Sequence, residues 1–399
     1  MMDYNKILKY LYSLESSKIK LGLANIKSLL NDIGNPESQL NCIHVAGTNG
    51  KGSVCSMLFY ILKEAGYKVG LYTSPHLKKF NERIRIDDHL ISNREIVEYF
   101  LKIKPYIKNQ SFFEITTAIA FLHFNEKNVD FVVLEVGLGG RLDATNVVNS
   151  IISVITNIEL EHTDILGNTI GKVAFEKAGI IKNNVPLVTG AKGKALEVIK
   201  KIAQDRDSHL YLTKKFVDAS FEYLNGGFQQ ENKNIALTAI NVLRKYYSLR
   251  INDEQIKDGI NKTQWQGRFE FISKNVLVDC AHNPAGFETL KRELTIIKRQ
   301  SKIKNYIFVI GIQNDKDIAT MLKIIKSLYS TIIFTKSNNE KATKTQELLK
   351  IFNIINQNKK IIIKIINTPR NALKYAKKIS SKNDLVVVTG SIYLVGEVA

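Results

Sequence analysis

The 399-residue sequence has few cysteines, few prolines and no long apolar run, and each shortage removes a class of protein. Its 3 cysteines, Cys42, Cys55 and Cys280, are odd in number and lack metal-ligand spacing, so neither a disulfide scaffold nor a cysteine zinc site is expected. Only 6 prolines, together with a hydrophobic content of 44%, are untypical of disordered or collagen-like chains. No run approaches the roughly 18–20 apolar residues that cross a bilayer, and the acidic N-terminal stretch does not fit a secretory signal. We therefore expect a cytoplasmic protein of folded domains that does not bind a membrane.

Acidic residues are also scarce, because 38 Asp and Glu face 57 Lys and Arg and give a formal net charge of +19. Three explanations compete: codon drift in a chain that is also rich in Ile and Asn, small polyanionic ligands, and nucleic acid. The basic residues are spread along the chain without interleaved aromatic residues, which makes nucleic acid the least favoured of the three. We expect no nucleic-acid partner, and we favour drift ahead of small polyanionic ligands.

The length suggests two or three compact units, at roughly 100–200 residues per domain. Apolar strand-like runs alternate with helical patterns from Cys42 to Thr189, and again from Val276 to Thr389. This alternation predicts an α/β fold with mostly parallel sheets that are covered on both faces. We place an N-terminal domain at residues 1–264, a linker at 265–270 and a smaller C-terminal domain at 271–399.

Local signals mark several helix ends. Ser92 and Glu95 have the spacing of a capping box, and Thr368 precedes Pro369 as an N-cap precedes its first helical residue. A further helix is predicted over Thr169–Ala178, with Phe175 and Ala178 on its buried side. On this pattern alone, Lys177 reads as a surface lysine.

The strongest local signal is the segment HVAGTNGKGS, His44–Ser53, in which a strand runs into a glycine-rich turn and then into an apolar helix. Such a turn directs backbone N–H groups and a helix N-terminus at one point, which suits a phosphate, and Lys51 adds a positive charge. The match to the usual phosphate-loop pattern is imperfect, because Val45 replaces its first glycine and Gly52 precedes Ser53. A glycine-rich turn without a ligand is the alternative, and we favour nucleotide binding.

Bound phosphates imply magnesium, held by a few oxygen ligands near the carboxyl ends of neighbouring strands. Three residues qualify: Ser74 after the strand at 69–73, Glu135 at the end of FVVLE, and His162 beyond the strand at 151–156. Each has an ordinary structural alternative, respectively an N-cap serine, a hydrogen-bonded strand-end glutamate and a solvated loop histidine.

In the second half, Asp279 follows a strand in DCAHNPAG, where an acid can bind a ribose hydroxyl, and Arg268 lies beside the predicted linker. The alternative for Arg268 is a surface arginine.

Motifs in a fixed order extend over residues 40–290 and the C-terminus: HVAGTNGKGS, YTSPHL, FNERIRI, SFFEITTAIAF, LEVGLGGRLDATNVV, EHTDILGNTIGKVAFEKAGIIK, WQGRFE, DCAHNPAG and TGSIYLVGE. Together they resemble the folylpolyglutamate synthase/dihydrofolate synthase branch of the Mur ligase family, in which Gly52 is a regular feature. The resemblance implies a P-loop N-terminal ATPase domain and a Rossmann-like C-terminal domain. One departure is Phe228, which stands where this family has a histidine in its G-x-H-Q-x-x-N stretch.

The resemblance also assigns site residues. It implies catalytic roles for Lys51, Glu135, His162, Lys177 and Arg268. ATP contacts are implied for Gly47, Thr48, Asn49, Gly50, Lys51, Gly52, Ser53, Asn232, Arg268, Asp279 and His282. The pteroate or folate site is implied at Ser111, Phe112, Phe113, Glu114, Leu142, Asp143 and Ala144. Magnesium, in two sites, is implied at Ser74, Glu135, His162 and a carbamylated Lys177.

The implied activity is ATP-dependent ligation of L-glutamate to dihydropteroate and to folate or tetrahydrofolate polyglutamate tails, through an acyl phosphate, by a monomer. The alternatives are a Mur-type amino-acid ligase that acts on another carboxylate, and a folylpolyglutamate synthase without the first activity. A nucleotide-regulated or nucleic-acid-binding module without enzymatic activity is a third.

Overall fold

The computed structural model describes residues 3–15, 22–216, 223–356 and 361–399. The chain divides into two compact units, Met1–Tyr223 with Gln229–Thr263, and Leu224–Phe228 with Gln264–Ala399. Residues 217–222 lie outside the described residues, within the stretch 205–226 whose limits the sequence does not set. No described helix is both long enough and apolar enough to cross a membrane.

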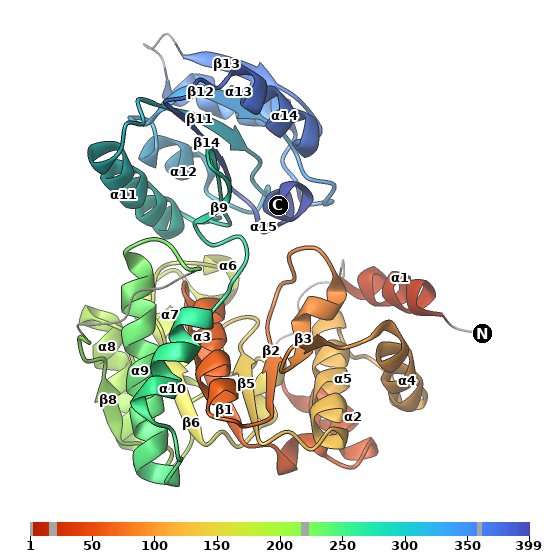
Figure 1. Cartoon of the computed structure of the whole chain (residues 1–399). Helices are drawn as coiled ribbons and strands as arrows, with labels where there is room; N and C mark the ends of the chain where they lie inside the picture. The colour runs from red at the N-terminus through yellow and green to blue at the C-terminus, as the bar shows by residue number, and fades with distance from the viewer. Residues whose placement is uncertain (1–2, 16–21, 217–222, 357–360) are drawn as a thin grey trace. The chain divides into compact units, whose positions relative to one another are not determined.

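The first unit is built on a twisted, mostly parallel sheet with the described strand order β4-β3-β2-β5-β1-β6-β7-β8 (Figure 1). Only β3 and β4 run antiparallel to their neighbours. The central strands β1 and β5 are buried at every position, as expected for parallel strands covered on both faces. The strands are β1 Cys42–Ala46, β2 Val69–Tyr72, β3 Ile84–Ile86, β4 His89–Leu90, β5 Phe131–Glu135, β6 Ile152–Ile155, β7 Leu187–Thr189 and β8 Leu210–Leu212.

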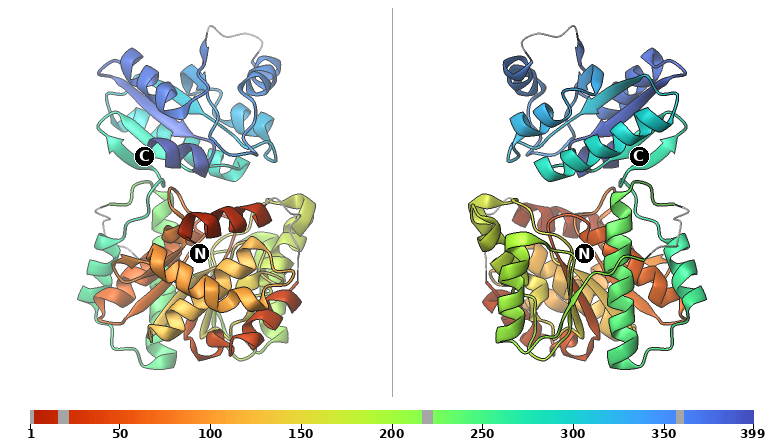
Figure 2. Two further views of the ribbon diagram at one scale, coloured as in Figure 1. Left: turned by 90° about the vertical axis from the view of Figure 1, so that its right-hand side faces the viewer. Right: turned by 90° about the vertical axis from the view of Figure 1, so that its left-hand side faces the viewer.

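Helices cover both faces of this sheet, with α3 and α10 on one side of the central strands and α5 on the other (Figure 1). The two views of Figure 2 bring first α4 and α5, then α8 and α9, to the front. The helices are α1 Tyr4–Glu15, α2 Ala24–Asp32, α3 Lys51–Glu64, α4 Asn93–Ile103, α5 Phe112–Glu126, α6 Thr163–Leu166, α7 Ile170–Ala178, α8 Gly193–Asp205, α9 Phe228–Tyr247 and α10 Asp253–Lys262, with 3₁₀ turns η1 Pro36–Gln39, η2 Phe80–Arg83, η3 Lys104–Tyr106 and η4 Ala144–Val147.

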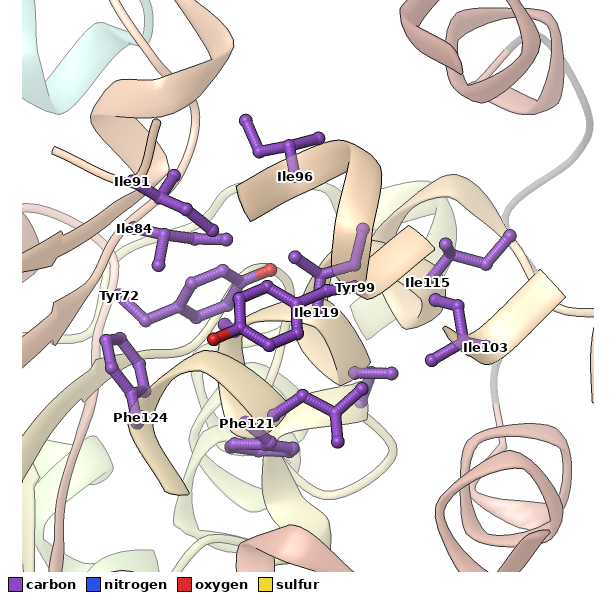
Figure 3. Packing of buried hydrophobic residues seen from close by; sticks show 14 of the residues in the cluster. Tyr72, Ile84, Ile91, Ile96, Tyr99, Ile103, Ile115, Ile119, Phe121 and Phe124 are labelled. Atoms are coloured by element: carbon purple, nitrogen blue, oxygen red, sulfur yellow. The ribbon is translucent and has the colours of Figure 1, made fainter. Parts of the chain in front are cut away.

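The apolar core on the α5 side joins helices to strands. Tyr72 of β2 and Phe124 of α5 lie beside Tyr99 of α4 and Ile119 of α5 in one cluster (Figure 3). All four side chains are almost fully buried, and the Tyr72 hydroxyl lies 3.0 Å from Thr117 Oγ1, so the buried phenol has a hydrogen-bond partner. This packing fixes the strand ends that lead into the candidate site.

The second unit has its own parallel-rich sheet with the described order β13-β12-β11-β14-β10-β9, in which β9 is antiparallel. Its core contains Phe308 and Phe334 from neighbouring strands and Phe352 from a helix. The elements are β9 Glu270–Ser273, β10 Val276–Asp279, α11 Pro284–Gln300, β11 Asn305–Ile310, α12 Ile318–Ile324, β12 Tyr329–Phe334, α13 Thr345–Ile355, β13 Ile362–Ile365, α14 Pro369–Ile379, β14 Asp384–Thr389 and α15 Ile392–Val398.

The predicted α/β class is confirmed, and so is the capping box of Ser92 and Glu95. Thr368 is the N-cap residue of α14, although its side chain makes no cap hydrogen bond. The short strands β3, β4, β8 and β9 are absent from the sequence prediction. They have two to four residues each, too few for a period-two pattern to stand out.

Candidate active site

The loop between β1 and α3 has the geometry of a phosphate-binding turn. Gly47 follows β1 and Gly50 precedes α3, and their φ angles of 146° and 83° are values that favour glycine. Gly50 is the N-cap residue of α3, so the N–H groups of the first helical turn open beside the loop. These groups and the positive end of the helix dipole favour an anion there.

Side chains and backbone from the end of β6 hold this loop in place. The Asn49 N–H donates to Asn157 Oδ1 at 2.8 Å, and the Thr48 N–H donates to the Asn157 carbonyl at 2.8 Å. Thr156 Oγ1 donates to the Asn49 carbonyl at 2.7 Å. The loop is therefore preorganised by its own protein contacts.

Both loop glycines lie against other side chains. A Cβ atom on Gly47 would overlap Thr156 Oγ1, and one on Gly50 would overlap Asn232 Oδ1. Asn232, on α9, is buried and donates from Nδ2 to Gln229 Oε1 at 2.9 Å. The structure thus places the sequence-predicted Asn232 at the loop, even though Phe228 departs from the expected motif in the same helix.

Phe228 belongs to the second unit of the chain. Its ring makes an edge contact with Phe269, with ring centroids 6.3 Å apart, and packs against the apolar core of the second unit. The residue that replaces the expected histidine is therefore part of an aromatic cluster within that unit.

Two lysine amines reach the phosphate loop from different helices. Lys51 Nζ, at the start of α3, donates to the carbonyl oxygens of Gly47 and Thr48 at 3.1 and 3.0 Å. Lys177 Nζ, in the last turn of α7, donates to the same Gly47 oxygen at 2.7 Å. The sequence-predicted phosphate loop and Lys177 are thus in direct contact.

Lys177 is buried, with 3% of its surface exposed, so its interpretation as a surface lysine is wrong. Phe175, predicted on the buried side of α7, is instead 50% exposed and lies under the Arg141 guanidinium, 5.5 Å from ring centroid to Cζ. The pKa of Lys177 is lowered from its ordinary 10.5 to about 7, mainly by burial and also by the charge of Lys51, whereas Glu161 and Asp143 act in the opposite direction. A substantial fraction of this amine is therefore uncharged near neutral pH.

The other predicted metal ligands follow strands that neighbour β1. In the sheet β2, β5, β1 and β6 lie side by side, and Ser74 follows β2, Glu135 ends β5 and His162 precedes α6 after β6. The Ser74 N–H donates to Glu135 Oε2 at 3.0 Å, and the Glu135 side chain is almost completely buried. The structure brings Ser74 and Glu135 together and places His162 at the N-cap of α6, beyond the loop that follows β6 on the other side of β1.

These residues fit a magnesium ion that is held mainly by phosphate and water. Within the described ranges, no three His, Cys, Asp or Glu side chains converge as a protein-only metal site would require. Magnesium commonly takes only one or two carboxylates and completes its shell with waters and substrate phosphates. Glu135 is a buried carboxylate at the end of β5, which pairs directly with β1. The loop after β1 is suited to phosphate, so a buried carboxylate and a loop suited to an anion share one end of the sheet.

The residues predicted for the pteroate site form two groups, the first at the start of α5. Ser111 and Glu114 form its capping box, with the Ser111 N–H donating to Glu114 Oε2 at 2.7 Å. The ring of Phe112 stacks on Tyr12 with centroids 5.8 Å apart, and the Arg83 guanidinium lies 5.1 Å from its centroid. Phe113 lies against Gly137, where a Cβ atom would come within 2.5 Å of Phe113 Cζ.

The second group, Leu142, Asp143 and Ala144, lies in the loop that leads from β5 to the η4 turn. Asp143 is buried and is the N-cap residue of η4. Its carboxylate accepts from the Leu138 N–H at 2.8 Å, the Thr145 N–H at 3.0 Å and the Thr145 hydroxyl at 2.5 Å. Burial raises the pKa of Asp143, and these hydrogen bonds act against the rise.

In the second unit, the predicted ATP contacts lie at the end of β10. The Asp279 carboxylate is buried and accepts from the Phe269 N–H at 2.9 Å and the Ala281 N–H at 2.8 Å. Burial raises the pKa of Asp279, and the positive charge of Arg268 is the first effect against it. His282 Nδ1 lies 2.9 Å from the Cys280 carbonyl. Arg268, Asp279 and His282 are thus grouped at one strand end.

Two family models together match most of the chain. The model of the Mur ligase middle domain matches residues 45–269, and the model of the dihydrofolate synthetase C-terminal domain matches residues 269–399. The dihydrofolate synthase/folylpolyglutamate synthase of Bacillus subtilis is 33% identical over 95% of this chain and 94% of its own length. The chain belongs to the dihydrofolate synthase/folylpolyglutamate synthase family.

Solved structures of this family have the same fold. Escherichia coli FolC in complex with DHPP and ADP is 30% identical, with a TM-score of 0.89 over 99% of this chain and 96% of that one. A bifunctional folylpolyglutamate synthase/dihydrofolate synthase with Mn, AMPPNP and L-glutamate bound is 29% identical, with a TM-score of 0.85 over 99% of this chain and 97% of that one.

The sequence alone did not predict the residues that hold the phosphate loop of this chain in place. Thr156 and Asn157 contact the loop directly, and Thr48 Oγ1 lies 3.0 Å from the Glu159 N–H. The available signal was their position, since Thr156 and Asn157 directly follow β6, a buried strand next to β1, and Glu159 lies in the same loop.

Proposed function

We propose that this chain is an ATP-dependent, ADP-forming ligase that joins L-glutamate to dihydropteroate and to the γ-glutamyl tails of folates. The observation that carries the proposal is the preorganised loop Gly47–Ser53, on which Lys51 and Lys177 converge beside the buried Glu135. Family membership supports the same activity, because the Bacillus subtilis relative, which the chain covers over 94% of its length, carries both enzyme names.

ATP is proposed to bind with its phosphates on the loop residues Gly47–Ser53, against Asn232. The amides of the first turn of α3 and the amine of Lys51 would then face the β- and γ-phosphates. Arg268, Asp279 and His282 are proposed as contacts to the rest of the nucleotide, on the basis of the resemblance. In this scheme residues 1–264 form the ATPase domain, residues 265–270 the linker and residues 271–399 the C-terminal domain.

The acceptor is proposed to lie between the residues that begin α5 and the loop before η4. Phe113 is partly exposed and offers an aromatic ring beside Phe112, which itself stacks on Tyr12, and Asp143 offers a buried carboxylate that is held by three hydrogen bonds. A pterin presents a flat ring with several N–H donors, so an aromatic face and a fixed carboxylate match it chemically.

Two magnesium ions are proposed, with Ser74, Glu135, His162 and a carbamylated Lys177 as protein ligands. Magnesium would supply positive charge that offsets the repulsion between a substrate carboxylate and the triphosphate. Carbamylation needs a neutral amine, and the lowered pKa of Lys177 supports its capacity to react with carbon dioxide near neutral pH. Its proximity to Lys51 would favour the anionic carbamate over the ammonium.

The chain's own groups then account for the reaction. The acceptor carboxylate attacks the γ-phosphorus in line, and the acyl phosphate and ADP form. Lys51 and the α3 amides stabilise the negative charge that moves toward the β-phosphate. The glutamate amine next attacks the acyl carbon, and inorganic phosphate leaves. The protein supplies position and electrostatics, and no protein nucleophile takes part.

Product analysis with separate acceptors tests the proposal. The purified chain is incubated with ATP, magnesium and L-glutamate, plus either dihydropteroate or tetrahydrofolate, while ADP release and product mass are followed. We expect ADP release and a mass gain of one glutamyl residue with each acceptor. Product from tetrahydrofolate alone would indicate a folylpolyglutamate synthase without the first activity. If neither dihydropteroate nor tetrahydrofolate is converted, a Mur-type ligase for another carboxylate would be favoured. Size-exclusion chromatography with light scattering tests the proposed monomer.

A further inference from the structure

His44 is a fully buried histidine in the centre of the first sheet. It lies on β1, two residues before the strand ends, and pairs with Leu134 of β5 and Ser153 of β6. Apolar residues are the usual occupants of such a position. The imidazole therefore calls for an explanation beyond core packing.

The hydrogen-bond partners of His44 form a chain that ends at Asp143. His44 Nε2 lies 2.8 Å from Thr145 Oγ1, and the Thr145 hydroxyl donates to Asp143 Oδ1 at 2.5 Å. A hydroxyl has one hydrogen, and here the carboxylate receives it. Thr145 Oγ1 must therefore accept from His44, which fixes the proton on Nε2.

The other ring nitrogen of His44 fits this assignment. Nδ1 is buried and has no hydrogen-bond partner among the described residues. A buried, unprotonated nitrogen that lacks a donor costs less free energy than a buried N–H that lacks an acceptor. Burial also lowers the pKa of His44 to about 3, with the charge of Lys182 as a further cause. The ring is neutral, and its Nε2–H serves a single partner. An apolar side chain of similar volume would avoid the unpartnered Nδ1, so stability alone does not account for the histidine.

The hydrogen-bond chain from His44 through Thr145 to Asp143 connects two parts of the proposed site. His44 lies on the strand that leads into the phosphate loop, and Asp143 lies in the acceptor loop, where its carboxylate also holds the Leu138 N–H at 2.8 Å. That loop begins directly after Glu135. We propose that His44 is a positioning residue, which donates through Thr145 to orient the Asp143 carboxylate for the pterin end of the acceptor. The inference rests on the proposed function, because it assigns a substrate to Asp143.

Substitutions at both ends of the chain test the inference. His44→Leu removes the donor and keeps an apolar volume, whereas His44→Gln offers an amide N–H donor near the position of Nε2. Thr145→Val removes the hydroxyl at nearly constant volume, and Thr145→Ser keeps it. Thr145→Val breaks the hydrogen-bond chain without changing a residue of the sheet, so the inference can still be tested if His44→Leu does not fold.

Steady-state kinetics with dihydropteroate and with ATP separates positioning from general damage. We expect His44→Leu and Thr145→Val each to raise the KM for dihydropteroate by about 10-fold, with the KM for ATP changed by less than about two-fold. The Gln and Ser variants should restore most of the affinity. The double variant should be no worse than either single one, because both break the same chain. Equal losses for both substrates, unchanged KM values or additive effects would overturn the inference.

Two further readouts separate this inference from the proposed function. Wild-type turnover of dihydropteroate tests the proposed function by itself, and its absence would overturn both claims. Nitrogen-15 NMR of histidine-labelled protein, assigned by the loss of one signal in His44→Gln, tests the chain without any substrate. A neutral Nε2–H tautomer that persists to about pH 5 is expected from a ring this buried. An Nδ1–H tautomer, or titration near the ordinary histidine pKa, would overturn the inference even in an active enzyme.

Discussion

Lys51 and Lys177 donate hydrogen bonds to the same acceptor, the Gly47 carbonyl oxygen, at 3.1 and 2.7 Å. Two ammonium groups on one oxygen repel each other, and the buried one loses its charge more readily. Lys51 lies at the start of α3, where it is partly exposed, and Lys177 has 3% of its surface exposed. The contact therefore joins a partly exposed amine at the start of α3 to a buried amine whose lowered pKa, about 7, leaves a substantial fraction of it neutral near pH 7.

The first prediction concerns Lys51. Lys51→Ala should lower kcat by about 100-fold or more while the melting temperature stays nearly unchanged, because it removes a phosphate-facing charge from a turn. Lys63→Ala is the control, because Lys63 lies on the same helix and its Nζ pairs with Asp88 Oδ1 at 2.6 Å, away from the loop. Activity of Lys51→Ala within a few-fold of the control would contradict the phosphate-loop assignment.

Gly50 provides a matched pair with Gly34. The two residues have φ angles of 83° and 88°, but a Cβ atom on Gly50 would overlap Asn232 Oδ1, whereas one on Gly34 meets nothing within 4 Å. Both alanine variants should lose about 1 kcal/mol of stability through backbone strain. Only Gly50→Ala should also raise the KM for ATP, by about 10-fold, since it displaces Asn232 from the loop. An equal KM for ATP in the two variants would show that Asn232 is not part of the ATP site.

Glu135 and Glu82 are two carboxylates with different predicted roles. Glu135 accepts from the Ser74 N–H at 3.0 Å and is almost fully buried, whereas Glu82 accepts from the Leu77 N–H at 2.7 Å and the Lys79 N–H at 2.8 Å. Glu135→Gln should lose activity and magnesium dependence, yet melt at the same or a higher temperature without ligands, because it removes a buried charge. Glu82→Gln should melt at a lower temperature and keep its magnesium dependence. The opposite pattern would make Glu135 a structural residue.

The phosphate-loop strand and the helix that carries Lys177 show what a sequence does and does not specify. The strand that leads into the glycine-rich turn was predicted and is β1 Cys42–Ala46 in the structure, because a short apolar run before glycines has few alternatives. The burial of Lys177 was not predicted, because it depends on the Gly47 carbonyl, which lies 130 positions earlier in the chain. Helical periodicity cannot register such a partner, so it assigned the buried side to Phe175, which is half exposed. Loop supports such as Asn157 were missed for the same reason.

Stability should depend on pH through Lys177. Its pKa is about 7 in the folded chain and has an ordinary value of 10.5, so between these values the unfolded chain binds one more proton than the folded chain. Stability gains from this group as pH rises through that range, by up to about 1.4 kcal/mol per pH unit, and shows no such gain below about pH 7. In carbon dioxide-free buffer, Lys177→Met should therefore be more stabilising relative to wild type at about pH 7 than at about pH 9. A pH-independent difference in melting temperature would mean that the Lys177 amine is charged throughout.

The last prediction asks whether the group at position 177 is a cation or an anion in the working enzyme. If Lys177 remains an amine, Lys177→Arg should be tolerated and bicarbonate should have no effect on activity. If it carries a carbamate, arginine would place a positive charge where magnesium is proposed to bind, and the local sign would be reversed rather than conserved.

We therefore expect Lys177→Ala to be severely impaired and to recover part of its activity when small carboxylic acids are added, because they can occupy the vacated anionic position. Lys177→Arg should be impaired and should not respond to them.

Carbon-13 NMR with labelled bicarbonate should show one carbamate signal, which is lost in Lys177→Ala. Lys182→Met is the matched control, since the pKa of Lys182 is also lowered, to about 8, by burial and by Arg206 and Lys27, and its amine bonds the Asn146 carbonyl at 3.0 Å instead of the phosphate loop. The carbamate signal should persist in that variant. A signal that disappears with Lys182, or full activity in Lys177→Arg, would rule out a carbamate at Lys177.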